Sequence, residues 1–482
     1  MADTALTLAS RALLAADPHR PQYHFLPPSN WMNDPNGLIQ WKGNYHLFYQ
    51  YNPRAAVWGS IHWGHAISDD LVHWRDLPIA LAPTPGTADE DGVFSGCAFE
   101  ADGVPTVLYT GVRETDDGPR IEQPCLATST DDDLVTWRKH AGNPVIVSPP
   151  AGLDVLGFRD HSVWKEGDYW YQAIGSGVRD VGGAVLVYRS RDLRDWKYVG
   201  PLCVGDAKQT GAMWECPDFF QLGERHMLLV SPIPLGKTIY FAGDYREHRF
   251  TPLRRGLVDE GGCFYAPQSF TDAQGRRIMF GWLREGRDEA AQLAAGWAGV
   301  MSLPRLLLPR RDGRLGLQPA PELHALRGQR TYLREVSLAS SWNLDVSGAA
   351  LEIVAEIDAG TAAQVGIAVR RAPDGAEQTV ISYDAASQSL TVDRQRSSLD
   401  PATPRDTREA GLELGHAEPL RLQVFVDHSV IEVFANGQVC LTSRVYPTRP
   451  DSLGVELFAS GGSAHVNELD VWEMASVWPS PA

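Results

Sequence analysis

A short acidic motif that ends in tryptophan recurs along the first half of the chain. It reads SDDLVHW at 68–74 and SRDLRDW at 190–196, with a looser copy at 129–137 and a weaker echo at 243–250. The tryptophans of the first three copies lie 63 and then 59 residues apart. A repeat of about sixty residues that contains strand-like segments is typical of the four-stranded blades of a β-propeller. About five such repeats fit between residues 23 and 318.

Short strand-like runs recur at the same period. They are 45–51, 105–110, 169–174, 226–230 and 277–282. Most are rich in aromatic and β-branched residues and are followed by glycine, proline, asparagine or serine, as strands are. A five-bladed propeller arranges the innermost strands of all blades around one funnel. Residues that are far apart in the sequence can therefore converge there.

The residue composition of the chain changes after Arg305. A mixed, charged stretch with prolines at 309, 319 and 321 is typical of a linker. New alternating segments then follow at 350–357, 364–369, 419–427, 430–435 and 466–473. With turn signals such as Asn436-Gly437, they predict a β-sandwich. The sequence thus predicts an all-β protein with an N-terminal extension at 1–22 that carries a short amphipathic helix, a five-bladed propeller at 23–318, a linker at 319–333 and a sandwich at 334–482.

Composition excludes several classes of function. The chain has 482 residues and a formal net charge of −17, with acidic and basic residues mixed along it, which disfavours nucleic acid and anionic membrane surfaces as partners. The six cysteines are scattered without CxxC spacing, as in a reduced cytoplasmic protein. His62 and His65 lack further candidate ligands, so we expect no metal and no cofactor. Exposed edges of the sandwich could pair two copies into a homo-oligomer.

The stretch 30–37 (NWMNDPNG) places a carboxylate among turn-forming residues directly before a strand-like run at 38–51. A turn fixes the backbone and leaves the oxygens of Asp34 exposed at the mouth of a strand, where they can meet a ligand. Asp34 is therefore a candidate catalytic group. Taken alone, residues 34–37 are equally what an ordinary hairpin turn contains. The rest of the chain has to decide between the two interpretations.

Further motifs follow in a characteristic order. They are YNP at 51–53, WGS at 58–60, WGHA at 63–66, FSG at 94–96, FRD at 158–160, WECP at 214–217 and FYAPQ at 264–268. Together with 30–37 they resemble glycoside hydrolase family 32, the invertases, levanases, inulinases and sucrose-6-phosphate hydrolases that cleave β-fructofuranosides. The resemblance runs from about Tyr23 to the C-terminus. It includes 427–434 (DHSVIEVF), which looks like the C-terminal sandwich of that family, where its role is chiefly structural.

The resemblance implies roles for three acidic residues. Asp34 matches the family nucleophile and Glu215 the general acid/base of a retaining mechanism, in which two carboxyl groups lie about 5 to 5.5 Å apart. Asp160 matches a third acid that binds two sugar hydroxyls and stabilises the oxocarbenium-like transition state. Taken alone, Glu215 is an ordinary surface residue before a proline turn, and Arg159 is half of a surface ion pair.

The resemblance also implies a set of substrate-binding residues. They are Trp31, Asn33, Gln50, Trp58, Phe94, Ser95, Arg159 and Trp282. Amide and hydroxyl groups orient sugar hydroxyls, while tryptophan and phenylalanine pack on the sugar ring and exclude water. For Trp58 and Phe94, packing in the core is an almost equal alternative. Trp282 and Trp297 are expected to form walls on the leaving-group side.

Two positions depart from the family pattern. His161 stands where the family has proline after Arg-Asp, and Cys263 stands where many members have an acidic residue. We expect the first departure to alter the rigidity or polarity of the loop, so that restoring proline leaves cleavage largely in place. The second predicts a changed hydroxyl contact or subsite preference.

The prediction from the sequence is a retaining β-fructofuranosidase that hydrolyses sucrose through a covalent fructosyl-enzyme, with a sugar as its small-molecule partner. Three alternatives stay open at this stage. Sucrose 6-phosphate as substrate requires a basic side chain in the leaving-group site, and a fructosyltransferase requires a pocket in which sugars compete with water. The third is a non-catalytic sugar-binding propeller, against which the presence of all three acids argues.

Overall fold

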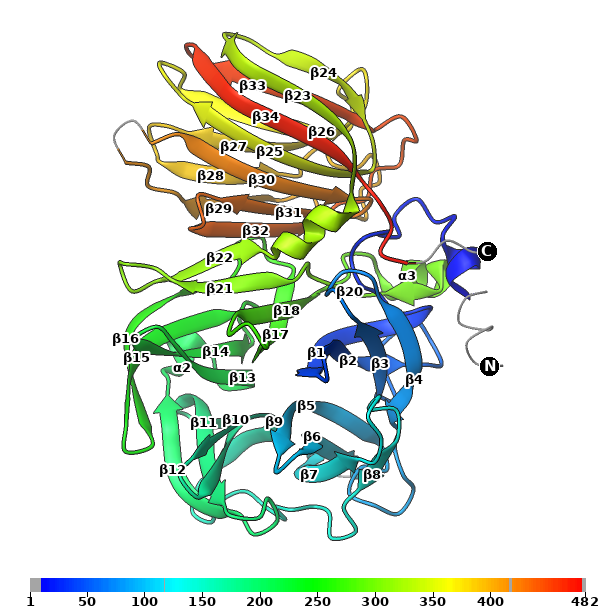
Figure 1. The fold of residues 1–482 in the computed structure, drawn as a ribbon, viewed down its shortest axis with the longest axis vertical. Coiled ribbons are helices and arrows are strands. Elements are labelled where there is room, and N and C mark those ends of the chain that lie inside the picture. Colours follow the sequence, from blue (N-terminus) through cyan, green and yellow to red (C-terminus); the bar gives the residue numbers. More distant parts are fainter. Residues whose placement is uncertain (1–9, 117, 416–417, 479–482) are drawn as a thin grey trace.

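A computed structural model describes residues 10–116, 118–415 and 418–478. These residues form two β-rich parts, a propeller and a sandwich, as the sequence predicts (Figure 1). The described part of the predicted N-terminal helix is a helical turn at 10–14. Within the described ranges, no helix has the length and apolar character needed to cross a membrane.

The described residues of the propeller form five sheets, each of which begins with the strand nearest the centre. The first has β1 (Asn30–Trp41), β2 (Asn44–Asn52), β3 (His62–Ser68) and β4 (Arg75–Leu81). The second has β5 (Gly92–Ala101), β6 (Val104–Arg113), β7 (Ile121–Ser129) and β8 (Trp137–Lys139). The third has β9 (Val155–Glu166), β10 (Tyr169–Val178), β11 (Gly182–Ser190) and β12 (Lys197–Val204).

The two remaining propeller sheets complete the circle. The fourth has β13 (Met213–Leu222), β14 (Arg225–Ile233), β15 (Ile239–Arg246) and β16 (Arg249–Leu257). The fifth has β17 (Phe264–Thr271), β18 (Arg277–Leu283), β20 (Val300–Met301), β21 (Arg305–Pro309) and β22 (Leu315–Pro319). Two short helices occur: α2 (Ala207–Thr210) precedes β13, and α3 (Glu289–Ala295) follows β18. All five strand-like runs predicted at the sixty-residue period lie in the second strands of these sheets.

The inner strands β1, β5, β9, β13 and β17 form a closed ring. Each contacts the next, and β17 contacts β1 in turn. The short strand β19 (Trp297–Ala298) pairs in parallel with the start of β1 and so joins a segment from late in the chain to the first sheet. In Figure 1 the five sheets surround one centre, which holds a cavity of about 480 Å³ lined by residues of all five inner strands.

The recurring sequence motif is the loop between the third and fourth strands of a sheet. In the first copy, the carboxylate of Asp70 accepts hydrogen bonds from Ser68 Oγ at 3.1 Å and from the backbone N–H of His73 at 2.8 Å. Asp192 makes the same two kinds of bond in the third copy. The leucine that follows has a left-handed backbone in each, at Leu71, Leu134 and Leu193. The motif therefore closes the first three sheets locally, which explains why its copies are spaced by the length of one sheet.

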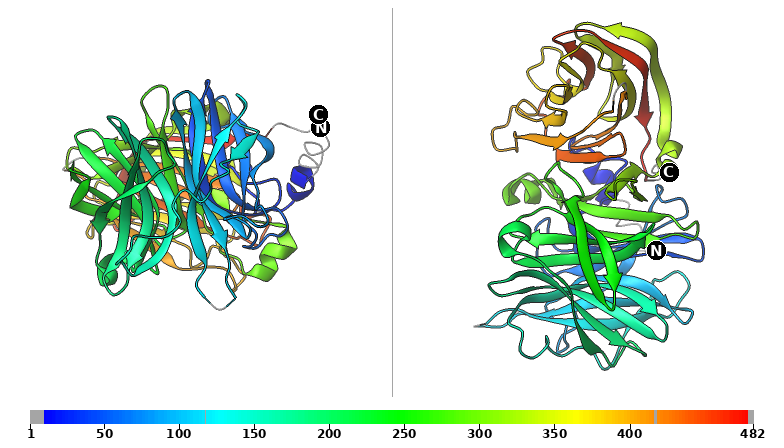
Figure 2. Two further views of the ribbon diagram at one scale, coloured as in Figure 1. Left: turned by 90° about the horizontal axis from the view of Figure 1, so that it is seen from below. Right: turned by 90° about the vertical axis from the view of Figure 1, so that its left-hand side faces the viewer.

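The sandwich consists of two sheets of six strands each within the described residues (Figure 2). One sheet has the order β23 (Arg327–Leu338), β34 (Ala464–Met474), β25 (Ala350–Asp358), β30 (Leu420–Asp427), β31 (Val430–Ala435) and β32 (Val439–Arg444). The other has β24 (Trp342–Ser347), β33 (Gly454–Ser460), β26 (Gln364–Arg371), β27 (Thr379–Asp384), β28 (Ser389–Asp393) and β29 (Thr407–Gly411). Aliphatic side chains of both sheets fill the space between them.

The expected linker at 319–333 is partly structured. It contains a 3₁₀ helix, Pro321–Leu326, and the first residues of β23, which begins at Arg327. β23 pairs with β34 from Arg327 onward, so the sandwich sheet starts earlier in the chain than the residue pattern suggested. The cause is that the exposed, charged face of β23 hides the alternation by which an edge strand is recognised in a sequence.

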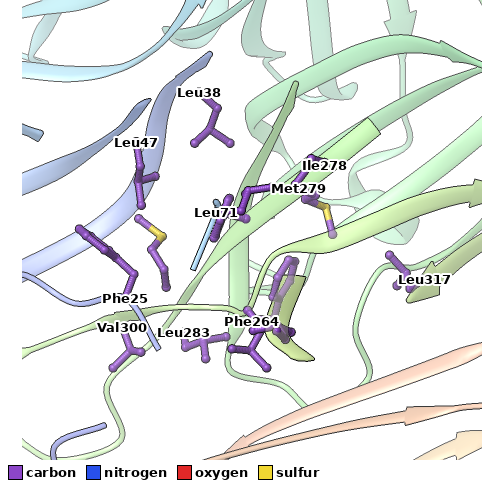
Figure 3. Close-up of a cluster of buried hydrophobic side chains, with 14 of the residues drawn as sticks. Phe25, Leu38, Leu47, Leu71, Phe264, Ile278, Met279, Leu283, Val300 and Leu317 are labelled. Atoms are coloured by element: carbon purple, nitrogen blue, oxygen red, sulfur yellow. The ribbon is translucent and has the colours of Figure 1, made fainter. Parts of the chain in front are cut away.

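A continuous core joins the propeller to the sandwich. The largest buried cluster contains Leu38 and Leu47 of the first sheet and Ile278 of the fifth (Figure 3), and it extends to Phe425 and Phe434 of the sandwich. Burial of apolar surface of this extent is the dominant stabilising contribution. The sandwich is thus fixed against the first and fifth sheets of the propeller.

Candidate active site

The three acids singled out in the sequence lie on inner strands of the propeller. Asp34 is on β1, Asp160 on β9 and Glu215 on β13. Pairing between the first and second strands shifts register in each of the five sheets close to the site, at 32–35, 94–96, 159–161, 215–218 and 265–268. Such bulges break the alternation of side chains and re-aim individual residues. They account for the convergence of side chains from separate strands at one end of the ring.

Cys216 connects two of the acids. Its Sγ lies 3.5 Å from Asp34 Oδ2 and 3.5 Å from Asp160 Oδ2. Its backbone N–H donates to Asp160 Oδ2 at 2.9 Å. Cys216 and Asp160 both have a left-handed backbone, which non-glycine residues seldom adopt and which is concentrated at functional sites. The structure therefore brings Asp34 and Asp160 together around a single thiol.

The hydrogen bonds that Asp34 accepts from described residues come from neutral donors. Ser95 Oγ donates to its Oδ2 at 2.7 Å, and Asn33 Nδ2 donates to its Oδ1 at 3.1 Å. The indole N–H of Trp31 in turn donates to Asn33 Oδ1 at 2.8 Å and fixes the amide. Hydrogen bonds thus connect four residues predicted to form the site: Trp31, Asn33, Asp34 and Ser95.

Glu215 is held by a cation and a phenol. Arg159 Nη2 donates to Glu215 Oε1 at 2.9 Å, and the hydroxyl of Tyr265 donates to Oε2 at 2.7 Å. Arg159 Nη1 also donates to Glu122 Oε1 at 2.9 Å, so that the guanidinium bridges two carboxylates. Cys216, Tyr265 and Glu122 are absent from the predicted set. The first two lie inside the WECP and FYAPQ motifs and were visible there, whereas Glu122 belongs to no motif and is found only through its contact with Arg159.

Burial shifts the pKa values of two acids upward. Desolvation raises the pKa of Asp34 to about 6, against the hydrogen bond from Ser95, and the negative charge of Glu215 adds to the rise. Desolvation raises the pKa of Asp160 to about 8; Arg159 opposes this, and the charges of Glu215 and Asp34 add to it. Carboxyl groups crowded in one buried site do not all ionise together. Shifts of this kind are concentrated at functional sites.

Aromatic side chains form the rim. Trp58 is 49% exposed and meets Phe94 edge to face, with ring centroids 6.0 Å apart. Trp31 and Trp282 meet in the same way at 5.7 Å, and Trp282 lies 6.4 Å from Tyr265. Partly exposed rings beside buried polar groups can pack on the apolar face of a sugar. For Trp58, this exposure rules out the alternative of a simple core residue.

Gln50 stays a predicted site residue, and two other residues lie elsewhere than expected. Gln50 is only 2% exposed and its Nε2 donates to the carbonyl of Val93 at 3.2 Å. Trp297 is fully buried and its indole N–H donates to Asp17 Oδ2 at 2.7 Å, so the expectation that it forms a wall of the site is wrong. Cys263 Sγ donates to the carbonyl of Thr442 at 3.1 Å and therefore faces the sandwich.

The described residues contain no cluster of three or more His, Cys, Asp or Glu side chains that could hold a metal ion. All six cysteines are free. His65, from the WGHA motif, stacks on Phe48 at 4.0 Å and lies 3.0 Å from His46. Independently of these findings, the site presents two carboxyl groups in unequal surroundings: Asp34 lies beside neutral donors, and Glu215 lies beside a guanidinium and a phenol. Such differences divide acid and nucleophile roles between two carboxyl groups.

Comparison with known families matches nearly the whole chain. Residues 24–319 match the family described as glycosyl hydrolases family 32 N-terminal domain, and residues 322–473 match the glycosyl hydrolases family 32 C terminal. Among curated relatives, a sucrose-6-phosphate hydrolase of Zymomonas mobilis subsp. mobilis is 36% identical, with 98% of this chain and 95% of that protein covered. A raffinose invertase of Escherichia coli is 35% identical, with 97% and 98% covered.

Solved structures show the same architecture over the same length. Fructan 1-exohydrolase IIa from Cichorium intybus superimposes with a TM-score of 0.88 at 30% identity, covering 95% of this chain and 98% of that one. A sucrose-6-phosphate hydrolase from Lactobacillus gasseri superimposes with a TM-score of 0.83 at 28% identity, with 99% and 97% covered.

Proposed function

The chain belongs to glycosyl hydrolase family 32 and is a glycoside hydrolase, and we propose that it hydrolyses sucrose and related short β-fructofuranosides with retention of configuration. The observation that carries the proposal is the arrangement of Asp34, Asp160 and Glu215, which three inner strands bring to one end of the propeller. The partly exposed aromatic rings of Trp31, Trp58, Phe94 and Trp282 support a sugar as the substrate. Family relatives include a β-fructofuranosidase of Bombyx mori whose variant was solved with sucrose.

The proposed reaction has two steps. Asp34 attacks the fructosyl C2 and forms an ester bond while the bond from C2 to the bridging oxygen breaks and Glu215 gives its proton to that oxygen, so that glucose leaves. Glu215 then takes a proton from water, whose oxygen attacks C2, and the ester to Asp34 breaks to release fructose. Asp160 lies beside the positive charge that develops on the ring. Arg159 and Tyr265 orient the carboxyl group of Glu215 through its two oxygens.

The test is the amount of free glucose and free fructose released over time from sucrose alone. Equal release supports hydrolysis, and glucose in excess of fructose shows transfer of fructose to another sugar. If sucrose binds but no sugar is released from sucrose, sucrose 6-phosphate or a fructan, the site is a binding site and the proposal is wrong.

A second candidate substrate is a sucrose that carries phosphate on its aldose unit, and one arginine favours it. The guanidinium of Arg284 lies 5.0 Å from the ring centroid of Tyr265, which contacts Glu215 and therefore marks the leaving-group side. Arg284 Nη2 donates to the carbonyls of Gly236 and Gly262 at 2.6 and 2.8 Å. The ion pairs formed by the described residues include Arg287 and Arg305 but not Arg284. A guanidinium without a carboxylate partner is suited to phosphate.

This candidate predicts a difference between two substrates. Arg284→Gln is expected to lower kcat/KM for sucrose 6-phosphate at least tenfold and to leave that for sucrose nearly unchanged, with Arg284→Lys intermediate. Equal effects on the two substrates would exclude a phosphate contact.

The six free cysteines fit a reducing compartment, and we place the protein in the cytoplasm on that ground.

A further inference from the structure

His161, one of the two departures from the family pattern, is buried between two sheets. Its side chain lies on β9, and the residue is only 2% exposed. Nδ1 lies 2.9 Å from Nε2 of Gln172 on β10, and Nε2 lies 3.0 Å from Oγ1 of Thr110 on β6. Gln172 and Thr110 are themselves fully buried. The imidazole therefore joins the second and third sheets directly behind Asp160.

The hydroxyl of Thr110 links this imidazole to both acids. It accepts a hydrogen bond from the backbone N–H of Asp160 at 3.0 Å and donates to the carbonyl of Ser95 at 3.1 Å. Ser95 Oγ then donates to Asp34 Oδ2 at 2.7 Å. A continuous path of hydrogen bonds thus runs from His161 through Thr110 to the backbone of Asp160 and to Ser95, the partner of Asp34.

The donors and acceptors of this path are consistent with one protonation state. Because Thr110 uses its proton toward Ser95, it accepts from His161, so the proton of the imidazole is on Nε2. Nδ1 is then free to accept from the amide of Gln172. Burial lowers the pKa of His161 to about 3, and the imidazole is neutral over the working range of an enzyme.

The backbone at Asp160 needs such support. Its φ angle is +63° and it lies at the register shift between β9 and β10. A non-glycine residue persists in this conformation only when its surroundings fix it. Here Thr110 holds the N–H of Asp160, and His161 holds Thr110.

We propose that His161 is a positioning residue for the reaction proposed above: its neutral imidazole orients the hydroxyl of Thr110, which fixes the backbone of Asp160 and the strand that carries Ser95. A proline at 161 has neither ring nitrogen, so the expectation that proline would be tolerated is reversed. The inference rests on the proposed function of Asp34 and Asp160.

The test compares variants along the path. His161→Ala, His161→Pro and Thr110→Val are expected to lower kcat on sucrose about 10- to 100-fold with little change in KM, because small misplacements of reacting groups cost this much. Thr110→Ser, which keeps the hydroxyl, should restore most of the loss. Since the bond from Ser95 holds the pKa of Asp34 down, the acidic limb of kcat/KM should also move to higher pH in the impaired variants.

A matched control is His65→Gln, which changes another buried histidine, whose ring lies 3.0 Å from His46 and stacks on Phe48. It should lower stability and leave kcat per folded molecule and the acidic limb unchanged. If the Thr110 and His161 variants behave like this control, His161 is merely structural and the inference is wrong. If the wild-type protein releases no sugar from any fructoside, the proposed function fails and this inference fails with it. Thr110→Val keeps the shape of the side chain, so it serves where the histidine variants do not fold.

Discussion

Buried and partly buried acidic side chains gather in two regions of this molecule, the propeller funnel and the interface between propeller and sandwich. In the funnel, Asp34 and Asp160 face one another around a thiol. At the interface, fully buried Asp427 lies 2.8 Å from Nδ1 of His24, and fully buried Glu432 pairs with Arg305 at 2.9 Å.

The two regions shift the pKa of the same chemical group in opposite directions. In both, burial by itself raises the pKa of a carboxyl group. At the interface, burial is opposed at Asp427 by the hydrogen bond and charge of His24 together with further donors, and at Glu432 by the charge of Arg305 together with His24. The opposing contributions jointly outweigh burial, so that both pKa values lie below their ordinary values. In the funnel, the partners of Asp34 and Asp160 do not fully offset burial, so the pKa values of both acids lie above their ordinary values. The interface acids, at which partners offset the effect of burial, hold the propeller and the sandwich together. The funnel acids, at which burial is not fully offset, carry the chemistry.

The largest expected effect is the loss of the nucleophile in the funnel. Asp34→Asn should lower kcat on sucrose by about four orders of magnitude or more, as removal of an attacking group does in other enzymes. The folded structure should be retained, because the amide replaces a group whose ionised form is poorly compensated. Sugar release per folded molecule, with folding checked by circular dichroism, measures this. Sucrose cleavage by folded Asp34→Asn near the wild-type rate would contradict the assignment of chemistry to the funnel acids.

Loss of a compensated acid should affect stability instead of chemistry. Glu432→Gln weakens a fully buried pair and leaves the charge of Arg305 with Asp259 as its one remaining carboxylate contact. Removing one partner of a buried pair costs about 3–5 kcal/mol in the free energy of unfolding. Chemical denaturation followed by fluorescence measures the cost. An unchanged midpoint would show that the interface acids do not hold the two parts together.

The pH dependence of stability sharpens the comparison. Because the pKa of Asp160 is about 8 in the folded protein, the folded state binds a proton that the unfolded state loses near pH 4, and this residue lowers stability as pH rises from about 4 to 8. Asp160→Asn should therefore be more stable than wild type at pH 8, by about 1 kcal/mol or more, and about equal to it at pH 4. Thermal unfolding at the two pH values measures the difference; a constant offset would contradict the raised pKa.

The smallest effect is expected at an exposed pair. Arg421 Nε lies 2.9 Å from Glu356 Oε2 on the surface of the sandwich, with the two side chains 57% and 36% exposed. Exposed pairs contribute between 0 and about 1 kcal/mol. Arg421→Gln should accordingly change the denaturation midpoint far less than Glu432→Gln. A comparable loss would mean that burial is not what separates strong pairs from weak ones here.

Features of the fold that are local in sequence were predictable. The loop around Asp70 repeats because each sheet needs the same turn, and turns carry a recognisable residue pattern. The second strands are equally visible because they are buried on both faces and consist mostly of apolar residues. The start of β23 at Arg327 was not predictable, because an exposed edge strand has little alternation of apolar and polar residues.

Features of the site that depend on convergence were predictable only through the family resemblance. The motifs around Asp34, Asp160 and Glu215 identified the acids, and the geometry then placed them on separate strands. Nothing in the sequence pairs Glu122 with Arg159 or His161 with Thr110, because these partners lie on different strands and share no motif. Trp297 was misplaced for a related reason: a tryptophan suited to a sugar is equally suited to a buried interface.

The most direct test of the distinction between the funnel and the interface is the initial rate at which glucose and fructose appear from sucrose, expressed per folded molecule, for wild type, Asp34→Asn and Glu432→Gln. We predict equal release of both sugars by wild type and by Glu432→Gln, and almost none by Asp34→Asn. Sucrose cleavage that persists in folded Asp34→Asn, or disappears in folded Glu432→Gln, would contradict the assignment of chemistry to the funnel and structure to the interface.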